Sequence, residues 1–427
     1  MTALLVVLLL IVLLLIRVPV AFAIIASGFV GLLILDPHTV DGIMQVVPAS
    51  SVQSLALSAI PLFMLMAQLI LMSGLIDSLF DAARAVMGRG RGSTGVSSVA
   101  AGVAFAAVSG SSTASAATLA KTTVSRMVSE GYRPSSAAGL VSSVGTLAGM
   151  IPPSIVLIFY AITAEQSVGD LLIAGIIPGL VIAVALVAVM FSSMLNDSNS
   201  VPAGKKVAWR DKVRMGVPAL PVLVLFGAVI GSIYFGVATA TEAAAIGCLA
   251  ALVLVVVRKK FSVAGFVQAL IDTVKSSAMI FTIIIGATIF GHFITESRVT
   301  GRIVTWIEGL AVPALLVMFV IMIGYLVLGF FMDQTAIIAL TVPVMLPVIE
   351  ALGYNAIWFG IFIVLMGEIG LITPPLGLNV FVVARTAGRD VTEVFRGAVP
   401  YAAGMLCVAT MFLLWPEIVL WLPGQMG

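Results

Sequence analysis

Charged side chains are scarce in this sequence. Only 9% of its 427 residues are Asp, Glu, Lys or Arg, whereas 61% are hydrophobic and the mean hydropathy is +1.23. A soluble domain carries about 25% charged residues, so this chain has too few of them to cover the water-exposed surface of a soluble protein of its size. Disordered chains are excluded for the opposite reason, because they are poor in apolar residues. The composition predicts an all-α polytopic membrane protein whose surface faces the lipid bilayer.

Histidine and cysteine are scarce as well, and the chain has no large excess of basic charge. The two histidines argue against a His-based metal centre, and a net charge of +2 without a basic stripe argues against a nucleic-acid partner. Cys248 and Cys407 each lie inside an apolar run, which favours packing over a disulfide or a metal pair. An intramembrane enzyme is also disfavoured. Residues 107–110 lack the first glycine of a rhomboid-like Gly-x-Ser-Gly motif, and the chain has no His-Glu-x-x-His pair.

Long apolar stretches are abundant. A helix needs about 20 apolar residues to cross a membrane, and seven stretches meet or approach that length: Val20–Leu35, Ser51–Gly74, Leu171–Met194, Val217–Phe235, Thr241–Val257, Ser276–Thr295 and Val399–Trp421. Met1–Ile16 is shorter and lacks the basic leading region and cleavage pattern of a signal peptide, so we expect a retained helix. Leu75–Gly88 and Glu296–Leu310 are amphipathic and are predicted to lie in the plane of the interface. A helical connector packed on the protein is the alternative for both.

Four further segments do not have the pattern of plain spans. Gly92–Arg126 and Pro313–Pro347 each consist of two arms around a polar tip, which predicts two re-entrant helical hairpins. Ser136–Tyr160 and Ile357–Val383 are each interrupted by a Pro-Pro pair. Because proline interrupts helical hydrogen bonding, these two segments are predicted to be broken helices.

These segments recur along the chain at one fixed offset in residue number. Pro152-Pro153 aligns with Pro374-Pro375 and Gly131-Tyr132 with Gly353-Tyr354, and the offset is the same for both pairs (374 − 152 = 353 − 131 = 222). It also relates Thr113 to Thr335, Gly145 to Gly367 and Pro178 to Pro400. Overall identity between the two halves is low, but the shared positions are helix breakers and turn residues. This pattern predicts an internal duplication.

The distribution of basic residues orients the two repeats. Residues 205–214 and Arg258–Lys260 are rich in Lys and Arg and are separated by two spans, so both are expected in the cytoplasm. The first hairpin then enters from the cytoplasm and the second from the periplasm, although Arg298 and Arg302 are left outside. This arrangement predicts inverted repeats, as in alternating-access secondary transporters. The predicted organisation comprises N-terminal scaffold helices (1–50), a first repeat (51–194), a cytoplasmic basic loop (195–216) and a second repeat (217–421).

Unwound backbone beside the polar tips offers ligands for ions. The helix must unwind around Gly145–Pro153, and its freed carbonyl oxygens suit a small hard cation. The hydroxyl groups of the Ser109–Thr113 tip could complete such a shell. In the second repeat Gly367–Pro375 supplies the carbonyls and faces Asp333–Thr335. Half-helix N-termini at the same points favour an anionic group.

Some of these residues also have a purely structural interpretation. Small residues let membrane helices pack closely. Glu368 either binds a cation or hydrogen-bonds to freed backbone amides, and Asn379 either donates to a substrate carboxylate or caps a half-helix. Glu242 is expected to cap the N-terminus of its span. Asp333, by contrast, is a carboxylate at membrane depth, which is costly and indicates function.

Five motifs, in this order, resemble the large membrane subunit of TRAP transporters, the DctM type. They are Ser-Gly-Ser-Ser-Thr-Ala at 109–114, Gly-Met-Ile-Pro-Pro-Ser at 149–154, Ala-Thr-Glu-Ala-Ala-Ala at 240–245, Met-Asp-Gln-Thr at 332–335 and Ile-Thr-Pro-Pro-Leu-Gly at 372–377. The resemblance covers nearly the whole chain. It implies an elevator-type transporter that imports an organic acid anion, such as a dicarboxylate or sialic acid, across the bacterial inner membrane, driven by sodium.

The resemblance also implies partners. These are a small membrane subunit of the DctQ type and a periplasmic substrate-binding protein of the DctP type. Because the chain starts directly with the large subunit, the small subunit is expected to be a separate chain. The alternative is a self-sufficient sodium-coupled carboxylate symporter without a binding protein. Neither an organic cofactor nor enzymatic activity is expected.

Transferred residue by residue, the resemblance implies two sodium (Na+) sites that flank one substrate site. The first sodium site is assigned to Ser109, Ser111, Thr113, Gly145, Ala148 and Pro152. The second is assigned to Asp333, Thr335, Gly367, Gly370 and Thr373. The substrate site is assigned to Ser112, Thr146, Pro153, Gln334, Glu368, Pro375 and Asn379.

Overall fold

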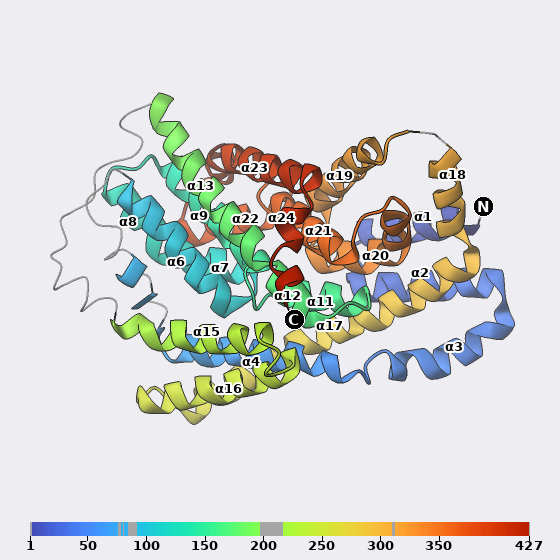
Figure 1. Cartoon of the computed structure of the whole chain (residues 1–427), viewed down its shortest axis with the longest axis horizontal. Coiled ribbons are helices and arrows are strands. Elements are labelled where there is room, and N and C mark those ends of the chain that lie inside the picture. The colour runs from blue at the N-terminus through green and yellow to red at the C-terminus, as the bar shows by residue number, and fades with distance from the viewer. Residues whose placement is uncertain are drawn as a thin grey trace.

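The computed structural model describes residues 2–75, 78–79, 81–83, 92–196, 217–309 and 312–426. Within these ranges the chain is helical, without a β-strand, and its helices form an elongated bundle (Figure 1). The expected all-α composition is therefore confirmed for the described chain. Most of the basic loop expected at 195–216 and of the amphipathic segment Leu75–Gly88 lies outside the described residues.

Eight helical stretches of the described chain are long and apolar enough to cross a membrane, and the count rises to nine if one bent helix pair is a single span. At most half of each stretch is buried inside the protein, so the remaining apolar surface suits lipid. The protein is accordingly a multi-pass membrane protein. The eight are Leu55–Met72 (η1 and α4), Val168–Ser193 (α12 and α13), Val217–Tyr234 (η3 and α15), Ala240–Val257 (α16), Val263–Ser297 (α17), Ala314–Phe331 (α19), Gln334–Ala351 (α20) and Val391–Leu414 (α23).

One side of the bundle is built around α17. It runs along α2 (Val20–Leu35) and α4 (Ala59–Met72), and α16 packs on α4 in turn (Figure 1). Gly31 of α2 permits a close approach, because a Cβ atom there would lie 2.5 Å from the ring of Phe293 on α17. The capping role predicted for Glu242 is confirmed, and it takes the form of a capping box at the start of α16. Thr239 Oγ1 accepts from Glu242 N at 3.3 Å, and Glu242 Oε2 accepts from Thr239 N at 2.8 Å.

The two predicted hairpins are present as helix pairs. The first consists of α6 (Ser93–Ser109), followed by α7 (Ser112–Leu119), a π-helical turn (Ala120–Val124) and α8 (Ser125–Ser129). Its tip turns at Gly110, whose φ of +59° lies in the left-handed region that glycine adopts readily. The second hairpin consists of α19 and α20 and turns at Met332 and Asp333.

The two broken helices are present as well. In the first, α9 (Pro134–Gly145) and α10 (Leu147–Met150) are followed by α11 (Ile155–Thr163), with a bend of 43° at the break. In the second, α21 (Ala356–Gly370) and α22 (Leu378–Ala387) flank residues 371–377. Both Pro-Pro peptide bonds are cis.

Helix boundaries recur with the same offset that relates the motifs of the two halves. The first arms end at Ser109 and Phe331, and the second arms begin at Ser112 and Gln334. The broken helices begin at Pro134 and Ala356, which differ by this offset too. In Figure 1, α8 at the base of the first hairpin lies toward one end of the long axis. Helix α18 (Val299–Gly309), which leads into the second hairpin, lies at the opposite end.

Two spans begin earlier than predicted, because charged residues continue the helix. Helix α17 begins at Val263, capped by Ser262, rather than at Ser276; Asp272 and Lys275 had interrupted the apolar run that marked it. Helix α23 covers Val391–Leu414 instead of Val399–Trp421. The side chain of Asp390 caps its first turn, and Pro416 follows shortly after its end.

Two further boundaries were not predicted correctly. A 14-residue helix, α3 (Pro37–Ser50), follows α2 directly. Asp36 caps it by accepting a hydrogen bond from His38 N at 3.0 Å, and Pro37 is its first residue, a favourable start for a helix. The predicted segment Glu296–Leu310 is divided, because Arg298 adopts a φ of +53° and ends α17 before α18 begins.

Replacing Gly139 by alanine is expected to lower the melting temperature of the protein. Helices α9 and α23 cross at Gly139 and Gly397, and a Cβ atom on Gly139 would overlap the Gly397 backbone. Overpacking of this kind costs about 1–3 kcal/mol. The matched control is Gly227→Ala in α15 (Leu220–Tyr234), where a Cβ atom meets nothing within 4 Å. Thermal unfolding in detergent compares the two variants, and equal Tm values would contradict the close crossing.

Candidate functional site

A cavity of about 430 Å³ lies where the two hairpin tips meet the α4–α17 side of the bundle. The tips contribute Ser109–Ala114 and Asp333–Thr335, and this space is called the tip cavity below. The wall opposite the tips comes from α4 and α17. Its residues are Met64, Ala67, Gln68, Leu71, Asp272, Thr273, Ser276, Met279 and Ile280.

The first tip is a tight turn of hydroxyl groups. Ser109 Oγ accepts a hydrogen bond from Ser111 N at 3.3 Å and donates to Ser111 O at 3.1 Å. Ser111 Oγ lies 3.4 Å from Thr113 Oγ1, so several oxygen atoms converge at the cavity surface. Ser111 is also the N-cap of α7, but its side chain makes no hydrogen bond to the first-turn amides of that helix. The positive end of α7 therefore faces the tip cavity without a side-chain cap.

The second tip combines a carboxylate with an amide. Asp333 caps α20: its Oδ1 accepts from Ala336 N at 2.8 Å and from Thr335 Oγ1 at 2.7 Å. The next residue, Gln334, is 6% exposed. Its Nε2 lies beside Glu368 but has no hydrogen-bond partner of good geometry among the described residues. A buried donor without a hydrogen bond is energetically costly, so Gln334 is a candidate for donating to a bound ligand.

The broken helices pack against the tips, and corresponding glycines make the contact in each repeat. A Cβ atom on Gly145 would lie 3.0 Å from Ser112 O, and one on Gly367 would lie 2.8 Å from Gln334 Cγ. Gly145 and Gly367 are equivalent positions of the two repeats, and so are Ser112 and Gln334. The same packing relation between tip and broken helix thus occurs twice.

Glu368 connects the two repeats. It is fully buried on α21, and its Oε1 accepts a hydrogen bond from Ser112 at the first tip. Gly149 of the first broken helix leaves room for this carboxyl group, because a Cβ atom there would overlap it. The second oxygen, Oε2, has no hydrogen-bond partner in the described part of the chain. The hydrogen-bond partner of Glu368 is therefore a side-chain hydroxyl rather than a freed backbone amide, and cation binding by Glu368 stays a prediction.

Other hydroxyl and amide groups of the broken helices are already engaged. Thr146 Oγ1 donates to Ser143 O at 2.5 Å, and Thr373 Oγ1 donates to Ile369 O at 2.5 Å. Asn379 Nδ2 lies 3.5 Å from Ser142 O on α9, so it joins the two broken helices and does not cap α22. Its Oδ1 is buried and has no hydrogen-bond partner among the described residues.

The predicted site residues fall into two groups. Those that line the tip cavity are Ser109, Ser111, Ser112, Thr113, Asp333, Gln334 and Thr335. Those that do not line it are Gly145, Thr146, Ala148, Pro152, Pro153, Gly367, Glu368, Gly370, Thr373, Pro375 and Asn379. Members of the second group contact the tips from behind; the Pro153 carbonyl, for example, would lie 2.9 Å from a Cβ atom on Gly110.

Sequence reasoning missed the wall that α4 and α17 contribute. Gln68, Asp272, Thr273 and Ser276 are its polar members, and none was predicted to belong to the site. A carboxylate on a membrane helix is a signal of function. Asp272 could have been found on that ground had the span been started at Val263.

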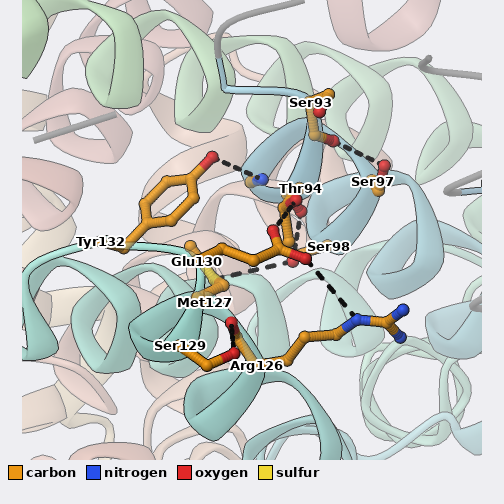
Figure 2. A network of polar contacts seen from close by, with 10 residues as sticks. Ser93, Thr94, Ser97, Ser98, Arg126, Met127, Ser129, Glu130 and Tyr132 are labelled. Atoms are coloured by element: carbon orange, nitrogen blue, oxygen red, sulfur yellow. Dashed lines mark hydrogen bonds and ion pairs between the residues drawn. The ribbon is translucent and has the colours of Figure 1, made fainter. Parts of the chain in front are cut away.

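Polar contacts also fix the base of the first hairpin (Figure 2). Thr94 in the first turn of α6 donates to the Glu130 carboxylate, and Arg126 Nε lies 3.8 Å from Glu130 Oε1. Gly95 N donates to the hydroxyl oxygen of Tyr132 at 3.1 Å. Burial raises the pKa of Tyr132, so the hydroxyl stays neutral at neutral pH. The two arms are thus tied together at the end that lies away from the tip.

Comparison with known proteins extends over nearly the whole chain. The family described as "Tripartite ATP-independent periplasmic transporter, DctM component" matches residues 7–418. The C4-dicarboxylate TRAP transporter large permease protein DctM of Pseudomonas aeruginosa is 34% identical over 402 residues, which cover 94% of this chain and 93% of that protein. The ectoine/5-hydroxyectoine TRAP transporter large permease protein UehC of Ruegeria pomeroyi is 32% identical and covers 96% of this chain and 95% of its own.

A solved structure shares the fold. The crystal structure of the YdaH transporter of Alcanivorax borkumensis matches with a TM-score of 0.63 and covers 88% of both chains. Sequence identity over this match is 14%, so the likeness concerns the fold alone.

Proposed function

Because the chain belongs to the family of DctM components of tripartite ATP-independent periplasmic transporters, we propose that it moves an organic acid across the bacterial inner membrane, driven by sodium. It is a transport subunit and not an enzyme. The observation that carries the proposal is the tip cavity, where two hairpins related by one sequence offset bring their polar tips to one space. Secondary transporters with inverted repeats place their sites at such a meeting point of discontinuous helices.

A carboxylate group and a sodium ion find different ligands in the tip cavity. The first-turn amides of α7 and the amide of Gln334 are donors and suit a carboxylate. The hydroxyls of Ser111 and Thr113, the Asp333 carboxylate and the carbonyls of the broken helices are oxygen ligands, which suit sodium. We assign one sodium site to each repeat, behind or beside its tip, with the organic acid between them.

The position of the cavity supports alternating access. Helix α4 lines it with Met64–Leu71, close to its C-terminal end, and α17 lines it with Asp272–Ile280, in its N-terminal half. Arg258–Lys260 precede α17 and orient this end of both helices toward the cytoplasm. We therefore assign this structure to the inward-facing state of the proposed mechanism. In the outward-facing state the hairpins and broken helices would slide along α4 and α17 as an elevator.

The family description supports the proposed partners. A tripartite, periplasmic transporter has two components besides this one. These are proposed to be a small membrane subunit and a periplasmic protein that delivers the organic acid. The alternative is a symporter that binds its substrate without such a protein.

Reconstitution in liposomes tests the function. We expect uptake of the organic acid only when the chain, the small membrane subunit and the binding protein are all present and an inward sodium gradient is imposed. Uptake by the chain alone would favour the self-sufficient symporter. Uptake that is equal with a sodium gradient and with a potassium gradient would contradict sodium coupling.

A further inference from the structure

The charges that line the tip cavity are all of one sign. Asp333 lies at the second tip, and Asp272 lies on α17. Among the described residues that line the cavity there is no Lys, Arg or His. With sodium bound at Asp333, as proposed above, a substrate with two carboxylates would still meet the uncompensated like charge of Asp272.

Asp272 is not neutralised by a neighbouring cation. Its Oδ1 accepts a hydrogen bond from Gln268 Nε2 at 2.9 Å, and in the described part of the chain it has no ion pair. Lys275, three residues on, is exposed and does not line the cavity. Asp272 itself lines the cavity, with Thr273 and Ser276 beside it on the same wall. A carboxylate in this position is suited to a cationic group that enters the cavity.

The tip side of the cavity has the opposite character. The N-terminus of α7 lacks a side-chain cap, and its first residues, Ser112 and Thr113, line the cavity. Gln334 is more than nine-tenths buried and lines the same side, with an Nε2 donor that has no hydrogen-bond partner among the described residues. These groups donate hydrogen bonds and therefore suit a negatively charged group. The cavity is consequently bipolar, with donors on the tip side and a carboxylate on α17.

We propose that the tip cavity selects a zwitterionic organic acid. Its carboxylate binds the α7 N-terminus and Gln334, and its cationic nitrogen binds Asp272. This assignment rests on the proposed function, since it names the substrate class of the same site. Asp333 remains with the proposed sodium site, which leaves Asp272 as the residue that determines specificity for the second charge of the substrate.

Matched probes test the assignment. 4-Aminobutyrate and succinate have the same carbon chain and differ in one end, an ammonium group against a carboxylate; glycine betaine and ectoine add two further zwitterions. Calorimetric titration uses the full chain with its small membrane subunit in saturating sodium. At least one zwitterion is expected to bind about tenfold more tightly than succinate, the ratio for a difference of about 1.4 kcal/mol.

Asp272→Asn should reverse this preference. The variant keeps an oxygen for Gln268 but loses the charge, so the affinity for the zwitterion should fall about tenfold and that for succinate should rise. Glu296→Gln is the matched control, because Glu296 is exposed near the other end of α17 and does not line the cavity; it should change neither affinity.

Three results would overturn the assignment. One is succinate binding at least as tightly as every zwitterion, another is no binding of any zwitterion, and the third is an unchanged ratio in Asp272→Asn. A sodium titration of the same samples keeps the underlying function separate. Binding that did not depend on the sodium concentration would count against sodium coupling. The ratio of the affinities for zwitterion and succinate would still decide the role of Asp272.

Discussion

Asp333→Asn is expected to raise the sodium concentration that half-saturates transport by at least about tenfold. Asparagine keeps the oxygen that accepts from Ala336 N and Thr335 Oγ1, so the cap of α20 is preserved and only the charge is lost. A unit charge close to a cation contributes several kcal/mol at an effective dielectric constant of about 20, and about 1.4 kcal/mol already corresponds to tenfold. Initial uptake rates across a sodium titration measure the change.

The matched control is Asp390→Asn. Asp390 also caps a helix, since its Oδ1 accepts from Thr392 N at 2.8 Å and Glu393 N at 3.2 Å, but it lies at the start of α23 and does not line the tip cavity. Its sodium titration should match that of the unmodified protein. If Asp333→Asn gave the same curve as Asp390→Asn, the second sodium site would have to be placed elsewhere.

Gly149→Ala is expected to lower the transport rate by about tenfold to a hundredfold. The added Cβ atom would overlap the Glu368 carboxyl group and separate it from Ser112. A buried polar group that loses its partner costs about 1–3 kcal/mol, and each step of about 1.4 kcal/mol is a factor of ten. The comparison variant is Gly231→Ala on α15, where a Cβ atom meets nothing within 4 Å. Uptake rates are compared at equal amounts of reconstituted protein.

A second background separates this effect from a general loss of folding. In Glu368→Ala the overlapped carboxyl group is absent, so Gly149→Ala should cause little further loss there. Residues in contact show such non-additive effects, whereas independent residues do not. An equal loss in both backgrounds would mean that Gly149 acts without Glu368.

Helix breakers made much of the fold predictable. Pro152-Pro153 and Pro374-Pro375 marked the two broken helices, and the polar tips marked the turns of the hairpins. These features are local, because proline and glycine change the backbone at their own positions. Their recurrence at one offset then related the halves without any knowledge of contacts.

Helix ends that depend on polar residues were harder to predict. The apolar run that predicts this span stops at Lys275, although the helix continues back to Val263. Hydropathy reports only the average composition of a segment. Asp272 is tolerated within this helix because it faces a cavity and not the lipid. The helix α3 was missed for a related reason: only its cap, Asp36 followed by Pro37, signals its start.

The candidate site was predictable at its tips but not across the interface. Thr113 and Asp333 line the cavity as their motifs suggested. The contact between Ser112 and Glu368 joins residues 256 positions apart, and no periodicity encodes such a pair. The resemblance assigned Thr146 to the substrate site; in the structure its hydroxyl donates to Ser143 O and lies against Met405, and the assignment stays a prediction.

The position of Glu368 differs between the two halves of the chain. Its counterpart in the first repeat is Thr146, whose hydroxyl donates to Ser143 O in the same broken helix. Glu368 instead accepts a hydrogen bond from Ser112 at the tip of the other repeat. Two identical ancestral chains would have carried either two such carboxyl groups or none. The two halves are complementary in this contact, because a chain made of two copies of either half would lack the hydrogen bond between Ser112 and Glu368.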